Sequence, residues 1–422
     1  MHILSKSTYI KGLQCKKALY MQKKHPYLRD KLSIEQRAKF QRGTDVGVLA
    51  HEVFPGGVDM SPNSPSQFPK RVQETWDNLS NPEVKVMYEA VFQYNDTLIM
   101  LDILVRDGDK WLAVEVKSSL RLSDTYYNDA ALQYYVLHGC GVPLSDFRLM
   151  YLNGDYVKEG PIDVQQLFKM ESVMQYVVER EDFVAKNVER LKAVVALPHA
   201  PAVEIGEQCD NPYPCDFYGH CWKLVREPDY YTIDYKTLYS LAPQPKPKSV
   251  AFLNLLMNRP AVPELDGTRP YEEMILAFAL QGEHETDGCF VWDCFEDHGR
   301  WKEAISLLIE KLSHYELIVC FTPQNLSTTL LRHEIIQNQT VGYKIFNLYD
   351  ILQEAKFYHP AIKRGLTLQR LETALFDEAK LFEHSRILLE ATSNDLISYQ
   401  QAREDLIAEN GIVAKTYQHL FK

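Results

Sequence analysis

Long apolar runs are missing from this sequence. It contains no stretch of 18 or more apolar residues, which is the length that suggests a transmembrane helix. The opening segment, Met1-His2-Ile3-Leu4-Ser5-Lys6, lacks the apolar core of a secretory signal peptide. No internal repeat is found either, which argues against a solenoid. These absences predict a cytoplasmic protein with no membrane partner.

An excess of positive charge is also missing. The 422 residues include 46 Lys or Arg against 57 Asp or Glu, for a net charge of −11, which argues against a protein that coats DNA. The first 43 residues differ, because they hold eleven Lys or Arg and only two acids. This basic N-terminal segment could form a phosphate-binding face. Its candidate nucleic-acid-binding residues are Lys11, Lys16 and Lys17. A solvated lysine-rich helix face is the alternative.

The pattern of apolar residues predicts an α/β protein. Residues 5–52 are expected to form helices with a break near His25-Pro26, and residues 163–194 to form one or two amphipathic helices. Between them, a helix is expected at 129–138. Strands are predicted at 84–94, 97–106, 110–118 and 147–153, with turn residues between the first three.

A stiff, polar segment marks the best domain boundary. Residues 242–248, Ala-Pro-Gln-Pro-Lys-Pro-Lys, follow a helix predicted at 229–241 and resemble a linker. We therefore expect one domain at 1–241 and a second at 249–422. In the second, strands are expected near 250–256 and 317–321, and strands or mixed elements at 270–282 and 288–295. The rest, from Trp301 onward, is expected to be mostly helical.

The second and third strands of the first domain carry two acids and a lysine. Side chains alternate along a strand, so Glu115 and Lys117 face the same side. A turn at Gly108-Asp109 would place Asp102 opposite Glu115, whereas a turn one residue earlier would place it diagonally. Both registers bring the three side chains to one face.

Two carboxylates within an apolar hairpin repel each other and resist burial. A divalent cation between them relieves both penalties, and Mg²⁺ prefers one or two carboxylates with phosphate and water. A lysine beside them could orient the attacking water or stabilise the phosphate. An ordinary surface ion pair is the alternative interpretation of Glu115 and Lys117.

This arrangement of Asp102, Glu115-Val116 and Lys117 resembles the core of PD-(D/E)XK nucleases. Further residues resemble the RecB-like branch of that family, namely the Gly-x-x-x-His element ending at His51, Glu89 on the preceding strand and Gln133 on the following helix. The tyrosine that this branch has four residues after the glutamine is Leu137 in this chain.

The resemblance implies a restriction-endonuclease-like mixed sheet flanked by helices, and it implies roles for these residues. His51, Asp102, Glu115 and the Val116 carbonyl would bind Mg²⁺ or Mn²⁺. Lys117 would position the water, with Glu89 assisting, and Gln133 would orient the lysine or the strand end.

Three cysteines, Cys209, Cys215 and Cys221, lie in a loop that contains proline and glycine, and Cys15 could supply a fourth ligand. Four thiolates suit zinc or an iron–sulfur cluster. One early and three late cysteines resemble the CRISPR-associated iron–sulfur exonucleases and related helicase–nuclease subunits, which favours a 4Fe–4S cluster over zinc. Unrelated buried thiols are the alternative. The other cysteines are expected in the core, namely Cys140, Cys289, Cys294 and Cys320. Cys289 and Cys294 could alternatively form half of a metal site.

The second half resembles an RNase H-like exonuclease domain found after such nucleases in a bacterial family. The segments that carry this resemblance are residues 260–263, 266–271 and 357–365. Where that domain has two acids on its first strand, this chain has Asn254 and Leu256, and its late helical acid falls among Asp405, Glu409 and Asn410. We therefore expect no hydrolysis by this domain, which would serve as a scaffold, a DNA-binding face or a surface for a protein partner.

The leading hypothesis is a metal-dependent DNA nuclease, acting as an exonuclease on single-stranded DNA or DNA ends. A non-catalytic nucleic-acid-binding or assembly protein with a structural metal is the main alternative. A redox-sensing regulator is a third.

Overall fold

The computed structural model describes residues 2–32, 34–223, 225, 230–283, 288–322, 344–362, 365–378 and 396–421. The chain divides into two compact units. The first unit comprises Met1–Val225 with Pro260–Tyr271, and the second comprises Arg226–Arg259 with Glu272–Lys422. Within the ranges just given, no helix is both long and apolar enough to cross a membrane.

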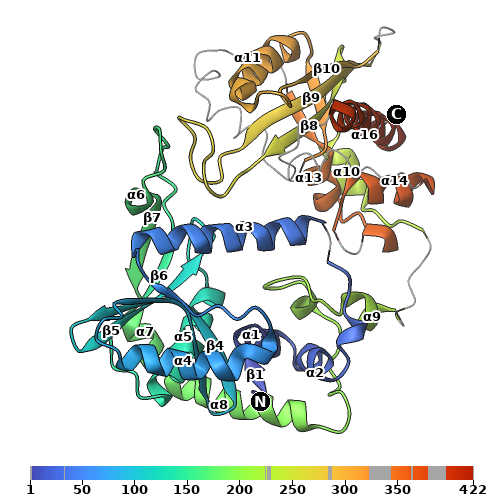
Figure 1. Cartoon of the computed structure of the whole chain (residues 1–422). Coiled ribbons are helices and arrows are strands. Elements are labelled where there is room, and N and C mark those ends of the chain that lie inside the picture. The colour runs from blue at the N-terminus through green and yellow to red at the C-terminus, as the bar shows by residue number, and fades with distance from the viewer. Residues whose placement is uncertain are drawn as a thin grey trace. The chain divides into compact units, whose positions relative to one another are not determined.

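The first unit is built on a mixed sheet in which seven strands lie within the described residues (Figure 1). The strand order is β2-β3-β4-β5-β6-β7, and β1 pairs in parallel with β4. The β3-β4-β5 meander and the β6-β7 pair are antiparallel, while β5 and β6 run in parallel. The bounds are β1 Leu4–Ser5, β2 Val58–Asp59, β3 Val86–Tyr94, β4 Thr97–Asp107, β5 Lys110–Lys117, β6 Leu144–Leu152 and β7 Phe168–Ser172.

Helices cover both faces of this sheet. Helices α1, α2, α5 and α8 share one core cluster with residues such as Met87 and Ala113, and α5 packs on β3, β4 and β6. Helix α3 packs on β5 and shares the other cluster with Tyr88 and Val114. The bounds are α1 Lys6–Gln14, α2 Lys16–Lys24, α3 Ile34–Ala50, α4 Phe68–Ser80, α5 Asp124–Gly139, α6 Val164–Leu167, α7 Met174–Glu179, α8 Glu181–Ala196 and α9 Tyr218–Trp222.

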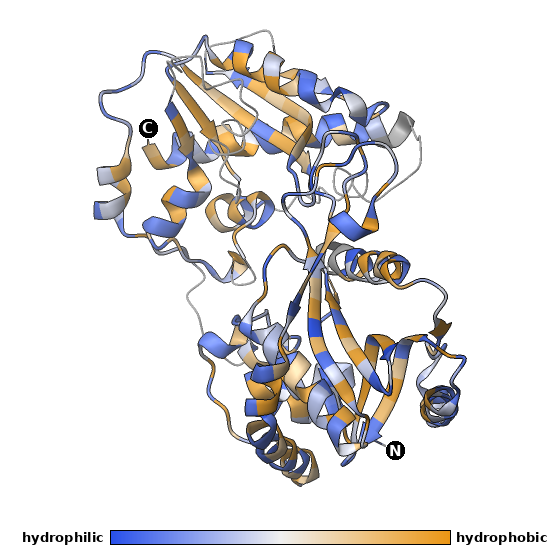
Figure 2. Cartoon of the chain, turned by 90° about the vertical axis from the view of Figure 1, so that its left-hand side faces the viewer, coloured by the Kyte–Doolittle hydropathy of each residue, from blue (hydrophilic) through white to orange (hydrophobic). Residues whose placement is uncertain are grey.

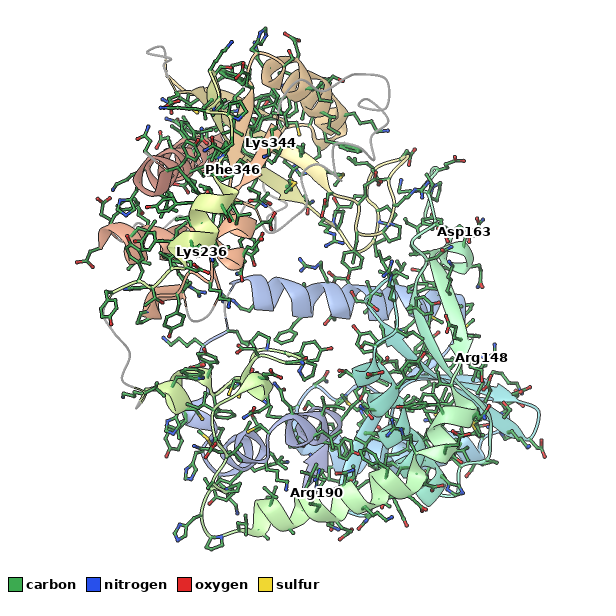
Figure 3. All side chains as sticks on the ribbon, turned by 180° about the vertical axis from the view of Figure 1, so that it is seen from behind. Arg148, Asp163, Arg190, Lys236, Lys344 and Phe346 are labelled. Carbon is green, nitrogen blue, oxygen red and sulfur yellow. The ribbon has the colours of Figure 1, made fainter. Side chains whose placement is uncertain are left out.

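The second unit has a mixed sheet in the order β10-β9-β8-β11-β12. Its first three strands in the chain are antiparallel, and the last two run parallel to β8. Figure 2 shows β8 and β9 mostly in the hydrophobic colour, and Phe346 of β12 packs against Tyr417 and Phe421 of α16 (Figure 3). The bounds are β8 Val250–Asn258, β9 Met274–Gly282, β10 Phe290–Asp293, β11 Leu317–Cys320, β12 Lys344–Asn347, α10 Tyr235–Leu241, α11 Trp301–Leu312, α13 Leu348–Glu354, α14 Leu368–Phe376 and α16 Leu396–Phe421.

The predicted α/β fold class is confirmed, with two mixed sheets flanked by helices. The break near His25-Pro26 is confirmed, since α2 ends at Lys24. Among the elements, the prediction of helices throughout 163–194 was wrong at β7, because Phe168–Ser172 pairs with β6. The helix predicted at 129–138 begins earlier, at Asp124. The assignment of 1–241 and 249–422 to nuclease and RNase H-like domains stays a prediction.

Candidate functional site

The β4–β5 hairpin settles the position of the two predicted carboxylates. Asp107 pairs with Lys110 across the two-residue turn Gly108-Asp109, and the same register runs on to Ile103 opposite Val114. The next position along the ladder places Asp102 opposite Glu115, so the first of the two registers is the one that forms.

A third acid extends this pair into a row. The β3–β4 ladder pairs the residues on both sides of Glu89 and Asp102, which leaves these two opposite each other. Glu89, Asp102 and Glu115 therefore occupy neighbouring positions on three adjacent strands. Glu89 has a left-handed φ of 52°, which is uncommon for a residue with a side chain. Backbone strain of this kind costs energy and often occurs at functional sites.

The paired register of β4 and β5 ends beside this row, at Ile103 and Val114. By the alternation of an antiparallel ladder, the Val116 N–H would bond to the Leu101 carbonyl. Instead it donates to Asp102 Oδ2 at 2.6 Å. The Asp102 carboxylate thus takes the place of a backbone acceptor, which fixes its orientation toward β5. The Val116 carbonyl, a predicted metal ligand, lies on β5 where that strand pairs with Met150 of β6.

Two ammonium groups lie against Glu115. Lys117 Nζ is 2.6 Å from Glu115 Oε1, and Lys6 Nζ is 2.7 Å from the same oxygen. The Glu115 side chain is only 1% exposed, compared with 31% for Lys6. Lys117 is also held by Asp129 Oδ2 at 2.5 Å, while Lys6 lies 3.9 Å from that oxygen. The result is a buried, alternating arrangement of two carboxylates and two lysines.

Burial and these charges shift the pKa values of Asp102 and Glu115 in opposite directions. Burial raises the pKa of Asp102 well above its ordinary value, and the charge of Glu115 raises it further. Burial acts on Glu115 in the same way, but Lys117 and Lys6 outweigh it and lower its pKa. Burial lowers the pKa of both lysines, and the surrounding carboxylates more than reverse this. The site therefore holds an ionised Glu115 beside an Asp102 that resists ionisation. Burial also raises the pKa of Glu89.

The sequence reasoning missed two members of this site, Lys6 and Asp129. Lys6 is the first residue of α1, and in the sequence it was counted only among the charges of the basic N-terminal segment. Asp129 lies in α5 one helical turn before Gln133, so both side chains are expected on one helix face. That i, i+4 spacing was the available signal. Gln133 is fully buried, and neither of its amide atoms has a hydrogen-bond partner within the described ranges.

His51 lies in the 3₁₀ turn His51–Val53, and its ring stacks on Tyr88 with 3.9 Å between ring centroids. Burial lowers the pKa of His51, and the charge of Asp59 partly opposes this. Across the part of the chain that the structure describes, His51 makes no hydrogen bond or ion pair with Asp102 or Glu115. The structure therefore brings His51 to β3 but not into contact with the acidic pair.

The four predicted cysteine ligands line one pocket, although Cys15 is far from the others in the sequence. Cys15 joins α1 to α2, Cys209 ends a 3₁₀ turn, and Cys221 lies in α9. The Cys215 N–H donates to the Cys209 carbonyl at 2.8 Å. Burial raises the pKa of Cys215 to about 11, with a smaller contribution from the other thiols of the pocket and against the hydrogen bond from the Phe217 N–H.

The predicted DNA-binding lysines lie close to this pocket. Lys11 forms an ion pair with Asp216 and lies 5.6 Å from the centre of the Phe217 ring. Lys17 lines the pocket itself, and its charge opposes the rise that burial causes in the pKa of Cys221. Lys16 is half-buried. In this structure Lys11 is paired with Asp216, and the charge of Lys17 favours the thiolate form of Cys221.

No group of three or more His, Cys, Asp or Glu side chains among the described residues meets the geometry of a metal site. Around Glu115, the reason is visible in the contacts, because two ammonium groups lie against the carboxylates. Of the cysteines outside the pocket, Cys294 and Cys320 are buried as expected, and Cys140 and Cys289 are half-buried.

In the second unit, Asn254 and Leu256 lie on β8, where the resemblance to RNase H-like domains expects acids. The Asn254 amide donates to Glu409 Oε2 at 3.0 Å and to the Leu406 carbonyl at 3.3 Å. Glu409 is thus the helical acid that meets the first strand, and Asn410 instead donates to the Phe252 carbonyl. A hydrogen bond joins the strand to α16 at this point.

Comparison with known proteins adds little. No protein-family profile matches the chain, and no curated protein matches its sequence. The chain is similar to the family B DNA polymerase of the hyperthermophilic archaeon Pyrobaculum calidifontis, with 11% identity and a TM-score of 0.29 over 75% of this chain and 43% of the polymerase. It is also similar to a protein designated SSO0001, with 10% identity and a TM-score of 0.17 over 47% of this chain and 87% of that one. Likenesses at these TM-scores assign neither a fold family nor an activity.

Proposed function

We propose that the first unit is a metal-dependent nuclease of the PD-(D/E)XK type that hydrolyses DNA phosphodiester bonds. The observation that carries this proposal is the row of Glu89, Asp102 and Glu115 across three strands, with Lys117 beside it. Buried acids in a row are unfavourable unless cations compensate them, and such strongly perturbed pKa values gather at functional sites.

The oxygen atoms of this row are of the kind that a hard divalent cation prefers, and such a cation would take the place of an ammonium group beside Glu115. Mg²⁺ and Mn²⁺ prefer oxygen ligands, and Asp102, Glu115 and the Val116 carbonyl supply them on the adjacent strands β4 and β5. Glu115 Oε2 is buried and has no hydrogen-bond partner within the described residues, so it is available to a ligand. Glu89 is a further candidate, and His51 would need to move toward the acids. A bound cation would lower the pKa of a water molecule and neutralise charge on the phosphate.

The two lysines have complementary roles in this proposal. Lys117, held by Glu115 and Asp129, would orient the attacking water or bind a phosphate oxygen. Lys6 is the more exposed of the two, so it can turn from Glu115 toward an incoming phosphate. Gln133 would support the position of Lys117 from the same helix as Asp129.

The cysteine pocket would hold a 4Fe–4S cluster, with zinc as the second choice. Four thiols from two distant segments line it, which suits either group. Because Cys15 and Cys221 are distant in sequence, a shared metal would close a long loop and stabilise the unit. Helix α1 begins at Lys6 and is followed by Cys15, so the pocket would also fix the helix that presents Lys6.

For the second unit we propose an RNase H-like domain that does not hydrolyse DNA. Its sheet has the strand order β10-β9-β8-β11-β12. Strands β8, β9 and β10 are antiparallel, and β11 and β12 run parallel to β8. Asn254 and Leu256 are poor or impossible ligands for Mg²⁺. The proposed substrate of the first unit is single-stranded DNA or DNA ends, and the second unit would present a surface to DNA or a protein partner.

The test is cleavage of a labelled single-stranded DNA by the full chain, purified without air, in Mn²⁺ and again with chelator. The expected result is cleavage that chelator stops and that Asp102→Ala or Lys117→Ala abolishes, with both variants folded. Asp155→Ala, an exposed acid paired with Lys169, is the matched control and should cleave normally. If DNA is only bound, or if both site variants still cleave, the proposal is wrong.

A further inference from the structure

Most of the connection between β8 and β9 belongs to the first compact unit and not to the second. Residues 260–271 join two strands of the second sheet, yet they belong to the compact unit that contains the carboxylate row. We call Pro260–Tyr271 the arm. Two of the three segments that carry the resemblance to an RNase H-like domain lie in this arm, although no role in that domain explains them.

The arm is docked by specific contacts as well as by burial. Ala261 is 4% exposed and belongs to the core cluster of Tyr88, Val114 and Met150, with Tyr271 packed against it. Contacts of this kind place the arm on the sheet face opposite α5.

Its tip is fixed to residues 158–160. The Gly267 N–H donates to the Lys158 carbonyl at 2.8 Å, and the Lys158 N–H donates to the Thr268 carbonyl at 3.0 Å. Asp266 accepts from both the Lys158 ammonium and the Gly160 N–H. Gly267 has a φ of 76°, which a residue without a side chain adopts readily. The motif Asp266-Gly267-Thr268 is therefore explained by docking.

The base of the arm ends beside the catalytic lysine. Tyr271 donates from its hydroxyl to the Ser118 carbonyl at 2.7 Å and lies 2.8 Å from Ser118 Oγ. Ser118 directly follows Lys117 at the end of β5. Tyr271 has a left-handed φ of 58°, and its N–H bonds to the Pro260 carbonyl at 2.8 Å, which closes the arm on itself. A strained residue held at both ends and aimed at the lysine strand suits a positioning role.

We propose that the arm is a built-in clamp, in which Tyr271 is a positioning residue that fixes the Lys117–Ser119 strand end and so completes the nuclease site. This inference rests on the proposed function. Both ends of the arm continue in the chain into β8 and β9. Ser119 accepts from the Leu152 N–H, and its own N–H donates to the Lys117 carbonyl, so motion at Ser118 would reach Lys117 directly.

The test uses the full chain with Tyr271→Phe, which removes the hydroxyl and keeps the ring. Tyr156→Phe is the matched control, because Tyr156 lies in the same core cluster and its hydroxyl accepts from the Asp163 N–H, away from Lys117. Two readouts are taken, amide hydrogen exchange at Ser119 and Leu152 without substrate, and the kcat and KM of DNA cleavage.

For Tyr271→Phe we expect faster exchange at these two amides, with exchange in β3 unchanged. We also expect a fall in kcat of about tenfold with KM unchanged, because small misplacements of a catalytic group slow the chemical step. Tyr271→Phe removes both contacts of the hydroxyl with Ser118, whereas Ser118→Ala removes only the one with Ser118 Oγ, so the double variant should cleave no more slowly than Tyr271→Phe alone.

Unchanged exchange in Tyr271→Phe, or faster exchange with a normal kcat, would overturn the inference, as would an equal loss in Tyr156→Phe. The proposed function fails separately, if the unaltered chain does not cleave DNA or if Lys117→Ala still does. In that case the exchange measurement alone upholds or overturns the clamp.

Discussion

The Lys6 ammonium lies 2.7 Å from Glu115 Oε1, although 109 residues separate the two in the sequence. This contact brings the first turn of α1 into the carboxylate site. It leaves Glu115 between two lysines, since Lys117 approaches the same oxygen. Lys6 is therefore expected to take part in the function of the site, even though no sequence motif singles it out.

Replacement of Lys6 by alanine should slow cleavage by about a hundredfold, which is the usual effect of removing one charged donor at a reacting phosphate or oxyanion. Lys6→Arg should retain part of the activity because the charge remains. Single-turnover cleavage with Mn²⁺ measures both effects. Lys70→Ala, at an exposed helical ion pair with Glu74, is the control. Equal rates for Lys6→Ala and Lys70→Ala would contradict a role for Lys6.

Asp129 should destabilise the metal-free protein as the pH rises. Burial raises its pKa above the ordinary value, more than Lys117 and Lys6 lower it. The folded state therefore holds this proton more tightly than the unfolded state, and stability is lost as the pH rises from the ordinary pKa through the raised one. Asp129→Asn removes that loss. The unfolding temperature of this variant should therefore rise relative to that of the unaltered protein as the pH increases across this range.

Thermal unfolding with chelator, between pH 4 and pH 8, would measure this difference. Asp234→Asn is the control of opposite sign, because hydrogen bonds from Thr237 lower the pKa of Asp234. Its stability relative to the unaltered protein should fall, or stay level, as the pH rises. An Asp129→Asn curve that runs parallel to that of the unaltered protein would refute the argument.

Cys15→Ser should lose bound iron or zinc and should also lose stability. The unfolding temperature is expected to fall by about 5 °C or more, which corresponds to roughly 2 kcal/mol for a unit of this size. Metal analysis after anaerobic purification, together with thermal unfolding, checks both. Cys140→Ser serves as the comparison, because that thiol bonds to the Gln93 carbonyl outside the pocket. Equal metal content in the two variants would show that Cys15 is not a ligand.

Asn254→Asp should destabilise the second unit instead of restoring a catalytic centre. The change removes a donor to Glu409 at 3.0 Å and places two carboxylates together in a buried site. The expected loss is about 1–3 kcal/mol, as for a buried hydrogen bond replaced by an unsatisfied group. Denaturant unfolding measures it, with Asn258→Asp near the end of β8 as control. New cleavage activity that survives Lys117→Ala would contradict the prediction.

Local pattern predicted that Asp102, Glu115 and Lys117 share one face of the sheet, but it left two registers open. The ladder selects the register with the turn at Gly108-Asp109, in which Asp102 is opposite Glu115. Local pattern also assigned Glu89 to the neighbouring strand, although its left-handed φ could not be foreseen. Short-range geometry controls all these positions.

The remaining members depend on contacts between distant segments, which one sequence does not reveal. Lys6 reaches Glu115 only because β1 pairs with β4 and directs α1 toward β5. The arm was expected in the second domain because it lies between two of its strands, and only packing shows that it belongs to the first unit. The short strand β7 is mostly exposed and polar, so its pattern did not distinguish it from a helix.

The central claim is that the carboxylate row binds a divalent cation, and a titration with Mn²⁺ followed by electron paramagnetic resonance tests it most directly. The unaltered chain should bind Mn²⁺ in a site that Glu115→Gln and Asp102→Asn each remove, while Asp155→Asn leaves it intact. Binding of Mn²⁺ that is the same in all four proteins would contradict the account.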